Sequence, residues 1–344
     1  MKVSVLLASA IGVAMLVSAS TRIASAQSPS PAGGCAPAGD LRFVCGLTNV
    51  EDIVPVEAGR WLVGSSFKLG SAGLYLIDTA AKSARTVALS VSPKPDPKYP
   101  GCAAPDLHGL STHGLAVSSS QGSPIVYAVN HGGRESIEIF RLHAAQARAE
   151  WLGCVVLPEG ASGNSVTALA DGGFAVTKFM DTRDKQAFQH MLSGQVTGTV
   201  YAWKPGQGFR EVPGTQLPGD NGLVVSADGH WLFINAYGSS EIYRVALSGG
   251  GTPTHVKVDF HPDNLRWAPD GTLFVTGQFL NAQSLGGPHG WATVRLEPQS
   301  MQVTPVVREP GRSQFDDATS AVQVGDVLWF GTFRGDRVAY RAAQ

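Results

Sequence analysis

Short apolar stretches recur six times along the chain, each shortly after a turn that contains glycine. Two examples are residues 61–64 (Trp-Leu-Val-Gly) and residues 231–234 (Trp-Leu-Phe-Ile). An Asp-Gly pair between two such stretches predicts a β-hairpin, because glycine adopts the positive φ that tight hairpin turns require. The six turns contain Gly59, Gly122, Gly172, Gly229, Gly271 and Gly325.

Most of these repeats continue with further strand-like stretches, such as residues 73–78 (Gly-Leu-Tyr-Leu-Ile-Asp) and residues 136–141 (Ser-Ile-Glu-Ile-Phe-Arg). Units of four strands that recur about every 40 to 65 residues are typical of propeller blades, whereas a β-sandwich shows no repeat of whole units. The pattern therefore predicts an all-β fold, a six-bladed β-propeller with four-stranded blades around an axial channel. Residues 41–50 are expected to complete the last blade and close the ring, which removes exposed strand edges. Because the first and last repeats are the least regular, five and seven blades are the alternatives.

The first residues have the features of a secretory signal peptide. Lys2 precedes an apolar run at residues 3–17, and residues 24–26 (Ala-Ser-Ala) form a small-residue cleavage site. The apolar run is too short to span a bilayer comfortably, which argues against an uncleaved membrane anchor. We therefore predict a signal peptide at residues 1–26 and a single propeller domain at residues 27–344. The protein is expected to be periplasmic or secreted, with no stable membrane anchor after cleavage.

Composition narrows the range of partners. The 344 residues include 41 glycines and 21 prolines, and 15% are charged, which suits a turn-rich β protein. The formal net charge of −1 and the lack of a basic cluster argue against nucleic acid, because neutralising phosphates requires concentrated Lys and Arg. Nucleic acid is therefore not an expected partner. The protein is expected to be a monomer.

The four cysteines are Cys35, Cys45, Cys102 and Cys154, an even number in a chain that is expected to leave the reducing cytoplasm. Two disulfides are therefore expected, and the sequence allows three connectivities. Proximity favours Cys35 with Cys45, and elimination then leaves Cys102 with Cys154. Buried free thiols are the alternative.

Polar side chains occupy one register of the repeats, eight residues before the turn glycine. They are Glu51, Asn164, Asn221, Asp263 and Asp317. Because the innermost strand of each blade lines the axis, equivalent positions form a ring around one mouth of the channel. Carboxylate and amide oxygens in this ring, with Asn264 beside Asp263, suit Ca²⁺, whereas zinc prefers sulfur or imidazole. The alternative is that these are ordinary turn residues, since Asn and Asp are common in loops.

Two histidines are candidates for a catalytic base. His113 stands nine residues before Gly122, and His131 follows the strand-like stretch at residues 125–130, so both could reach the same cavity. A histidine with a pKa near neutrality can take a proton from water held by a metal. The more common role of a lone histidine is a structural hydrogen bond, which is the alternative.

Other catalytic signals are absent from the sequence. It contains no Gly-x-Ser-x-Gly nucleophile elbow, no His-Glu-x-x-His zinc helix and no P-loop, which argues against a serine hydrolase or a dehydrogenase. Residues 180–198 interrupt the third repeat and are the expected helical insertion. The Pro-rich residues 92–105 precede the second repeat, and both segments could border the mouth.

Six short segments match motifs of a known family: residues 51–52 (Glu-Asp), 112–115 (Thr-His-Gly-Leu), 129–132 (Val-Asn-His-Gly), 163–166 (Gly-Asn-Ser-Val), 220–223 (Asp-Asn-Gly-Leu) and 262–264 (Pro-Asp-Asn). Together they resemble the paraoxonase and arylesterase family and, more broadly, the gluconolactonase and senescence marker protein superfamily of calcium-dependent propeller hydrolases. The resemblance implies a lactonase or arylesterase whose partner is a small-molecule lactone or ester substrate. It also implies His113 as general base and His131 as its supporting histidine. The calcium ligands that it implies are Glu51, Asn164, Asn221, Asp263 and Asn264.

The chain departs from this family in places. Paraoxonases hold a second, structural calcium with an aspartate at the position of Ser165, while Asp52 and the backbone of Leu115 match the rest of that site. We therefore expect a second ion to be weakly bound or absent. No cysteine beyond Cys154 can form the family's disulfide to the C-terminal end, so ring closure is expected to depend on strand pairing. The gluconolactonase branch shares the oxygen ligands but not the histidine pair, so both branches stay open.

Two other functions remain as alternatives. One is a non-catalytic exported propeller, in which a structural calcium joins the blades and the propeller faces bind a protein or glycan. It stays open because a fold does not establish chemistry. The other is a strictosidine-synthase-like condensing propeller, which would not need Glu51, Asn221 and Asp263.

Overall fold

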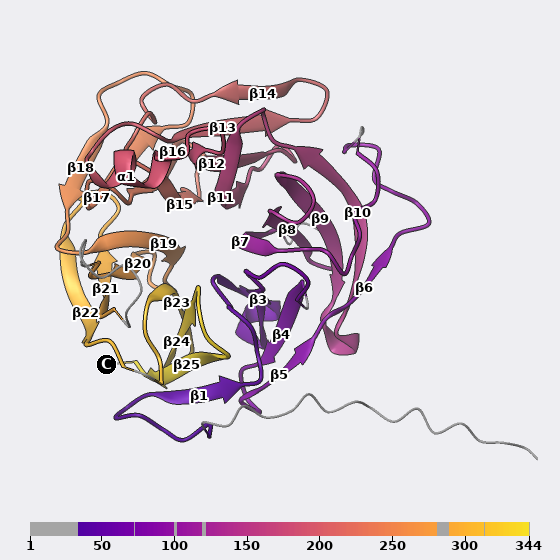
Figure 1. Cartoon of the computed structure of the whole chain (residues 1–344), viewed down its shortest axis with the longest axis vertical. Coiled ribbons are helices and arrows are strands. Elements are labelled where there is room, and N and C mark those ends of the chain that lie inside the picture. The colour runs from indigo at the N-terminus through magenta and orange to yellow at the C-terminus, as the bar shows by residue number, and fades with distance from the viewer. Residues whose placement is uncertain are drawn as a thin grey trace, which may run out of the picture.

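The computed structural model describes residues 34–71, 73–99, 102–118, 122–280, 289–312 and 314–343. Within them, six sheets stand around a central axis like the blades of a propeller (Figure 1). The predicted all-β, six-bladed propeller is confirmed. The predicted signal peptide at residues 1–26 lies outside the described residues.

The first three blades follow one another along the chain, and the innermost strand comes first in each except blade 2, whose outermost strand precedes it. Blade 1 consists of β2 (Ile53–Val56), β3 (Trp61–Ser65), β4 (Leu74–Asp78) and β5 (Ser83–Thr86). Blade 2 consists of β7 (Thr112–Ser118), β8 (Ile125–Asn130), β9 (Ser136–His143), β10 (Arg148–Val156) and an outer strand, β6 (Ala88–Val91). Blade 3 consists of β11 (Ala161–Ala168), β12 (Phe174–Asp181), β13 (Thr199–Lys204) and β14 (Gly208–Glu211).

The other three blades complete the circle. Blade 4 consists of β15 (Asp220–Val225), β16 (Trp231–Ala236), β17 (Glu241–Ala246) and β18 (Thr254–Lys257). Blade 5 consists of β19 (His261–Trp267), β20 (Leu273–Gln278), β21 (Trp291–Leu296) and β22 (Val303–Glu309). Blade 6 consists of β23 (Ala318–Val324), β24 (Val327–Thr332), β25 (Arg337–Ala342) and β1 (Arg42–Cys45).

Pairing of β1 with β25 closes the ring. The two strands run antiparallel with Phe43 opposite Ala339, so the first described strand completes the last blade, as predicted for residues 41–50. Inside the ring, each innermost strand contacts those of the two neighbouring blades, in the order β2, β7, β11, β15, β19, β23 and back to β2. Blade 2 differs from the predicted four strands because β6 pairs with β10 in parallel.

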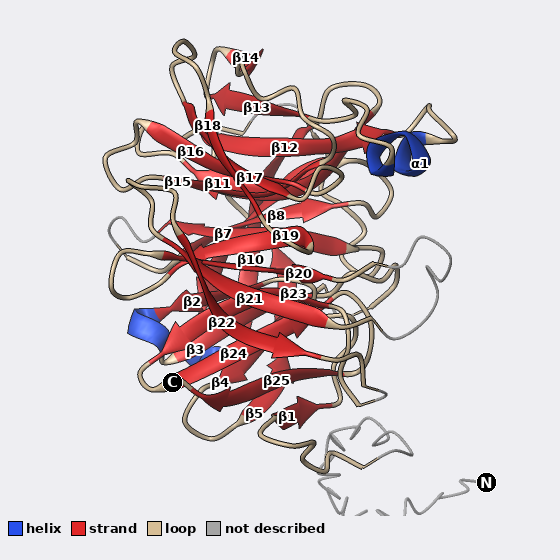
Figure 2. Ribbon diagram, turned by 90° about the vertical axis from the view of Figure 1, so that its left-hand side faces the viewer, coloured by secondary structure: helices blue, strands red, loops and turns tan. Residues whose placement is uncertain are grey.

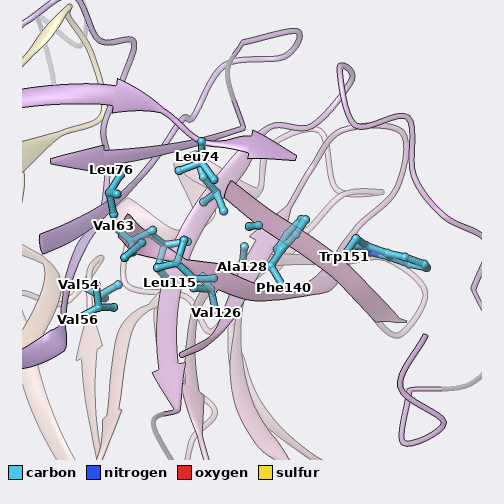
Figure 3. Packing of buried hydrophobic residues seen from close by; sticks show 14 of the residues in the cluster. Val54, Val56, Val63, Leu74, Leu76, Leu115, Val126, Ala128, Phe140 and Trp151 are labelled. Carbon is cyan, nitrogen blue, oxygen red and sulfur yellow. The ribbon is translucent and has the colours of Figure 1, made fainter. Parts of the chain in front are cut away.

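Apolar side chains fill the spaces between blades. Between blades 1 and 2, Val63 and Leu74 pack in one cluster with Leu115, Val126 and Phe140 (Figure 3). All five are fully buried. Since burying one such side chain contributes about 1.5–3 kcal/mol, this packing holds the blades, and with them the residues of the central channel, in one arrangement.

Both expected disulfides are present. Cys35 is bonded to Cys45 of β1, and Cys102 is bonded to Cys154 of β10. The Cα atoms of each pair are 6.0 Å apart, within the usual range for a disulfide. The connectivity favoured from sequence proximity is therefore confirmed.

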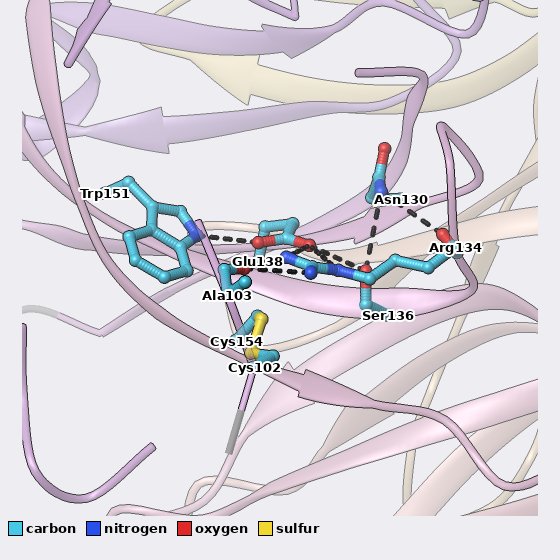
Figure 4. Close-up of a disulfide and its surroundings, with 8 residues drawn as sticks. All are labelled: Cys102, Ala103, Asn130, Arg134, Ser136, Glu138, Trp151 and Cys154. Carbon is cyan, nitrogen blue, oxygen red and sulfur yellow. Dashed lines mark hydrogen bonds and ion pairs between the residues drawn. A yellow bond between two sulfur atoms is a disulfide. The ribbon is translucent and has the colours of Figure 1, made fainter. Parts of the chain in front are cut away.

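A buried glutamate on β9 ties the segment around the second disulfide to blade 2 (Figure 4). Glu138 accepts hydrogen bonds from Arg134, Ser136 and the indole N–H of Trp151. Arg134 also donates to the backbone oxygen of Ala103 at 2.9 Å. These bonds satisfy a carboxylate that would otherwise be costly to bury.

Helices are few and short. They are α1 (Ala187–Leu192) and the 3-10 helices η1 (Glu57–Gly59) and η2 (Ala144–Gln146). The predicted helical insertion is confirmed by α1, which lies on one face of the ring (Figure 2). No helix in the described part of the chain is long and apolar enough to cross a membrane.

Candidate active site

One mouth of the channel opens into a cavity of about 560 Å³. Six residues singled out from the sequence line it: Glu51, His113, His131, Asn164, Asn221 and Asp263. They come from five different blades, so only the closed ring brings them together. Asn264 is fully buried beside this wall, where its amide nitrogen donates to Glu51.

Irregular pairing in the innermost strands accompanies these residues. In β15, Asn221 and Gly222 together oppose a single residue of β16. The register of β7, β11 and β19 shifts in the same way at His113, Asn164 and Asp263. Such a β-bulge bends the strand locally and re-aims a side chain, and bulges are common next to active sites. The strand ladder is thus interrupted where the candidate residues stand.

Neighbouring innermost strands approach one another closely at two glycines. A Cβ at Gly222 would lie 2.4 Å from the backbone oxygen of Asp263, and a Cβ at Gly114 would lie 2.3 Å from that of Asn164. Any side chain would push the strands apart. Asn235 stabilises the contact between β15 and β19 at Gly222, because its amide nitrogen donates to the backbone oxygen of Asp263 at 2.7 Å.

The candidate ligands present buried oxygens without hydrogen-bond partners among the described residues. These atoms are Oε2 of Glu51 and Oδ1 of Asn164, Asn221 and Asn264. An unpaired buried acceptor costs about 1–3 kcal/mol, so four of them in one wall are unfavourable unless a cation is bound there. The donor set fits Ca²⁺, which accepts carboxylate and amide oxygens together.

Two carboxylates share this buried wall. Burial, and then the charge of Asp263, raises the pKa of Glu51 well above its usual range. Burial likewise raises the pKa of Asp263 to about 7, although hydrogen bonds from Gln278 and Asn221 favour its ionised form. Both shifts reflect negative charge that lacks a counter-charge, which a divalent cation would supply.

No group of three or more His, Cys, Asp or Glu side chains that could hold a metal ion occurs within the described ranges. The five candidate calcium ligands do not form such a group, because three of them are asparagines. Amide oxygens suit a hard cation such as Ca²⁺ or Mg²⁺ and do not suit zinc, which prefers sulfur and nitrogen.

The two histidines form a hydrogen-bonded pair beside the oxygen ligands. Nδ1 of His113 lies 3.0 Å from Nε2 of His131, and Nε2 of His113 lies 3.6 Å from Oε2 of Glu51. Phe67 stacks on His113 with ring centroids 4.1 Å apart. Burial, and then the neighbouring His131, lowers the pKa of His113 well below its usual range, so this ring is neutral at pH 7.

Glu135 continues the histidine pair outward, and sequence reasoning missed it. Its two carboxylate oxygens lie 2.8 and 2.9 Å from Nδ1 of His131. Gly163 of β11 donates its backbone N–H to the same carboxylate at 3.1 Å, which links this residue to blade 3. The sequence did offer a signal for Glu135. It follows His131 by four residues and lies in the same loop, between β8 and β9.

Asp317 does not line the cavity. Its side chain is fully buried, and its oxygens lie 2.7 Å from Nδ1 of His289 and 2.9 Å from Nε of Arg334. Arg334 itself lines the cavity. The residue expected at the mouth therefore lies behind the wall, where it positions Arg334.

Much of the remaining wall follows a register that sequence reasoning did not use. In five blades, the second strand from the axis (β3, β8, β12, β16 or β24) leads to a residue that lines the cavity. This residue is always six positions after the first residue of the strand. These residues are Phe67, His131, Met180, Tyr237 and Phe333. Each second strand begins just after a turn glycine, so this ring was readable by counting forward from the turns.

The helix α1 forms part of the cavity wall and is packed firmly against blade 4. Phe188 lines the cavity, while the fully buried Met191 anchors the helix. A Cβ at Gly219 would lie 2.2 Å from the sulfur of Met191, and a Cβ at Gly238 would lie 2.2 Å from its backbone oxygen. None of the described residues among 92–105 lines the cavity, whereas Met180 and Phe188 of the insertion around α1 do.

Asp52 and Leu115, the residues considered for a second metal ion, are bonded to a guanidinium. Arg266 donates to a carboxylate oxygen of Asp52 and, at 3.1 Å, to the backbone oxygen of Leu115. The backbone N–H of Leu115 donates to the same carboxylate oxygen at 2.7 Å. Sequence reasoning did not single out Arg266, which follows Asn264 by two residues in β19.

No protein-family model matches the chain, and no curated protein matches it by sequence. Among solved structures, it resembles a luciferin-regenerating enzyme with a TM-score of 0.57 and 13% identity, covering 87% of this chain and 92% of that one. A gluconolactonase from Xanthomonas campestris gives a TM-score of 0.55 and 18% identity, covering 88% and 89%. A streptogramin B lyase gives a TM-score of 0.50 and 11% identity, covering 88% and 97%. At these identities the similarity establishes the shared fold, and the predicted resemblance to gluconolactonase-like propellers is confirmed at that level.

Proposed function

We propose that this propeller, which shares its fold with a gluconolactonase, is a calcium-dependent hydrolase of lactones or aryl esters. The observation that carries the proposal is the group of unpaired, buried oxygens of Glu51, Asn164 and Asn221 in the same cavity as the His113–His131 pair. A cation site beside a neutral base, in a cavity large enough for a small substrate, meets the requirements of metal-assisted hydrolysis.

Five residues would hold the ion: Glu51, Asn164, Asn221, Asp263 and Asn264. When bound, Ca²⁺ would supply electrostatic stabilisation of the negative charge that develops on a substrate carbonyl oxygen as water adds. The hydrogen bond from Asn235 to Asp263 and the close approach of neighbouring strands at Gly114 and Gly222 keep these side chains in place before substrate arrives, so little reorganisation is needed during the reaction.

His113 would take the proton from the attacking water. A separate base is needed because calcium, unlike zinc, acidifies water only weakly. Burial keeps the pKa of His113 low and its ring neutral, which leaves one ring nitrogen free to accept a proton. His131 would orient the ring through its hydrogen bond to Nδ1.

The wall favours apolar lactones and aryl esters over sugar lactones. Its apolar members are Phe67, Phe179, Met180, Phe188, Leu280 and Phe333. A sugar lactone carries several hydroxyl groups, and burying one without a partner costs about 1–3 kcal/mol. An aliphatic or aromatic substituent loses nothing against this wall and gains from burial.

Export of the protein belongs to the same proposal. The disulfides Cys35–Cys45 and Cys102–Cys154 favour an oxidising compartment, such as the periplasm or the extracellular space. Export would agree with the signal peptide expected at residues 1–26.

The test is a hydrolysis panel of an aliphatic lactone, gluconolactone and phenyl acetate, run with calcium and after treatment with EGTA. We expect turnover of the aliphatic lactone or phenyl acetate, its loss on chelation, and its return when calcium is restored. Circular dichroism of the chelated protein checks that the chain is still folded. Absence of chelation-sensitive turnover for every substrate would favour the non-catalytic propeller instead.

A further inference from the structure

The outer end of the histidine pair determines where its hydrogens lie. An ionised carboxylate only accepts hydrogen bonds, and both oxygens of Glu135 lie within 2.9 Å of Nδ1 of His131. That nitrogen must therefore carry the hydrogen. In a neutral imidazole the other nitrogen, Nε2 of His131, is then an acceptor.

The tautomer of His131 in turn decides that of His113. Because Nε2 of His131 accepts, Nδ1 of His113 must donate across their 3.0 Å contact. Nε2 of His113 is left without a hydrogen, and this is the nitrogen that lies 3.6 Å from Glu51 beside the oxygen ligands. The nitrogen able to accept a proton thus faces the cavity.

We propose that Glu135 is a positioning residue that selects these tautomers and so keeps the unprotonated nitrogen of His113 directed at the reaction site. The inference rests on the proposed function and deepens it by one residue. Two contacts hold the arrangement: the backbone N–H of Gly163 donates to Glu135, and Phe67 lies against both rings, with centroids 4.1 and 5.6 Å away.

The experiment compares Glu135→Ala and Glu135→Gln with Glu159→Ala, whose side chain is 90% exposed and serves as the matched control. For a substrate that the wild type hydrolyses, Glu135→Ala is expected to lower kcat by about 10- to 100-fold, the usual effect of losing a residue that orients a histidine. Because Glu135 also lines the cavity, KM should change less than kcat, and the Kd for calcium should not change. Glu135→Gln can still accept a hydrogen bond from His131, so its kcat should lie between those of Glu135→Ala and the wild type.

A spectroscopic measurement separates this inference from the proposed function. Nitrogen-15 NMR of the histidine rings should show hydrogen on Nδ1 of both His113 and His131 in the wild type, and a mixture of tautomers in Glu135→Ala. An unchanged kcat in Glu135→Ala would overturn the role of Glu135 even if calcium-dependent hydrolysis is found. If no substrate is hydrolysed, the NMR result still decides: a hydrogen on Nε2 of His113 in the wild type refutes the inference.

A different part of the channel carries a second inference. The guanidinium of Arg266 bonds to Asp52 and to the backbone oxygens of Leu115 and Leu265, the last two at 3.1 and 3.0 Å. Asp52 is fully buried, and Arg266 is 7% exposed. Asp52 precedes β2 of blade 1, Leu115 lies in β7 of blade 2, and Arg266 lies in β19 of blade 5, so one cation joins three blades.

We infer that Arg266 is a built-in cation that occupies the position at which the related family would place a second metal ion. Its charge neutralises Asp52, and its N–H groups satisfy the backbone oxygen of Leu115, which leaves no ligands for a divalent ion. The guanidinium would also repel such an ion. Ser165 supplies no negative charge that would help a metal ion to displace Arg266. The chain therefore binds a single divalent ion.

Calorimetric titration of EGTA-treated protein with calcium tests this inference in the wild type and in Asp263→Asn. We expect one ion per wild-type chain and a much weaker one in Asp263→Asn. Two ions per chain, or one ion whose affinity Asp263→Asn leaves unchanged, would overturn it. No binding at all would count against the proposed function while agreeing with a metal-free position at Arg266. In a second measurement, Arg266→Met should lower the unfolding temperature far more than Arg308→Met, whose side chain is 61% exposed.

Discussion

Replacing Asp263 by asparagine distinguishes a metal ligand from a structural residue, because the two roles change the stability of the calcium-free protein in opposite directions. Asp263 is 6% exposed, and burial raises its pKa to about 7. Above that pH the calcium-free folded state holds a buried negative charge that asparagine does not carry. Asp263→Asn is therefore expected to leave the free energy of unfolding of the calcium-free protein unchanged or raise it.

The effect on calcium binding should be opposite and large. Of the five candidate ligands only Glu51 and Asp263 are charged, so the substitution removes half of the formal ligand charge. At a usual Ca–O distance of about 2.4 Å, one unit charge on the ligand contributes about 14 kcal/mol for the divalent ion at an effective dielectric of about 20. Dehydration of the carboxylate and the ion, and the attraction kept by the amide dipole, offset most of this. A net loss of about 3 kcal/mol, or about 100-fold in Kd, is a conservative expectation.

Isothermal titration calorimetry measures the Kd, and chemical unfolding in EGTA measures the stability of the calcium-free chain. Asp259→Asn is the control, since it removes the same charge from a side chain that is 69% exposed and pairs with Arg308 at the surface. An unchanged Kd in Asp263→Asn would refute the reasoning. So would full activity of a metal-free Asp263→Asn protein, whatever its stability.

Three further predictions concern the base, the wall and pH. His113→Gln should leave the calcium Kd unchanged and lower kcat by about 100- to 10,000-fold, and an undiminished kcat would exclude it as the base. Phe188→Ala should raise KM for long aliphatic lactones by about 10- to 150-fold with little effect on phenyl acetate, since about 1.5–3 kcal/mol of apolar contact is lost. Equal effects on both substrates would argue against a role of Phe188 in the wall. Because the folded pKa of Asp263 lies near 7 and its ordinary value is 3.8, the folded chain binds more protons between them. The unfolding temperature of the calcium-free wild type, relative to Asp263→Asn, should therefore fall as pH rises from 4 to 8, and a rise would contradict the shift.

Glycine turns and strand periodicity in the sequence determine the architecture. Each hairpin is a local structure, because the turn at Gly229 or Gly271 and the alternation beside it act within a few residues. Repetition of one unit then implies a ring, and equivalent positions in the ring imply a common mouth. For this reason the spacing of Glu51, Asn164 and Asn221 from their turn glycines is enough to predict that they share one mouth.

Contacts between blades were not predictable in this way. Gly163 donates to Glu135, Arg266 donates to Asp52, and Met191 packs on blade 4, yet no shared spacing relates the residues of these contacts. Asp317 shows the same limit, since it shares the register of the ligands but lies behind the wall.

Local sequence therefore determined which positions recur in one register, whereas tertiary packing decided which of these side chains line the mouth and which of their atoms meet. The physical reason is that backbone propensity acts over neighbouring residues and sets the strand register. The direction of a side chain at a bulge depends instead on the close approach of the next blade, which exists only once the ring has closed.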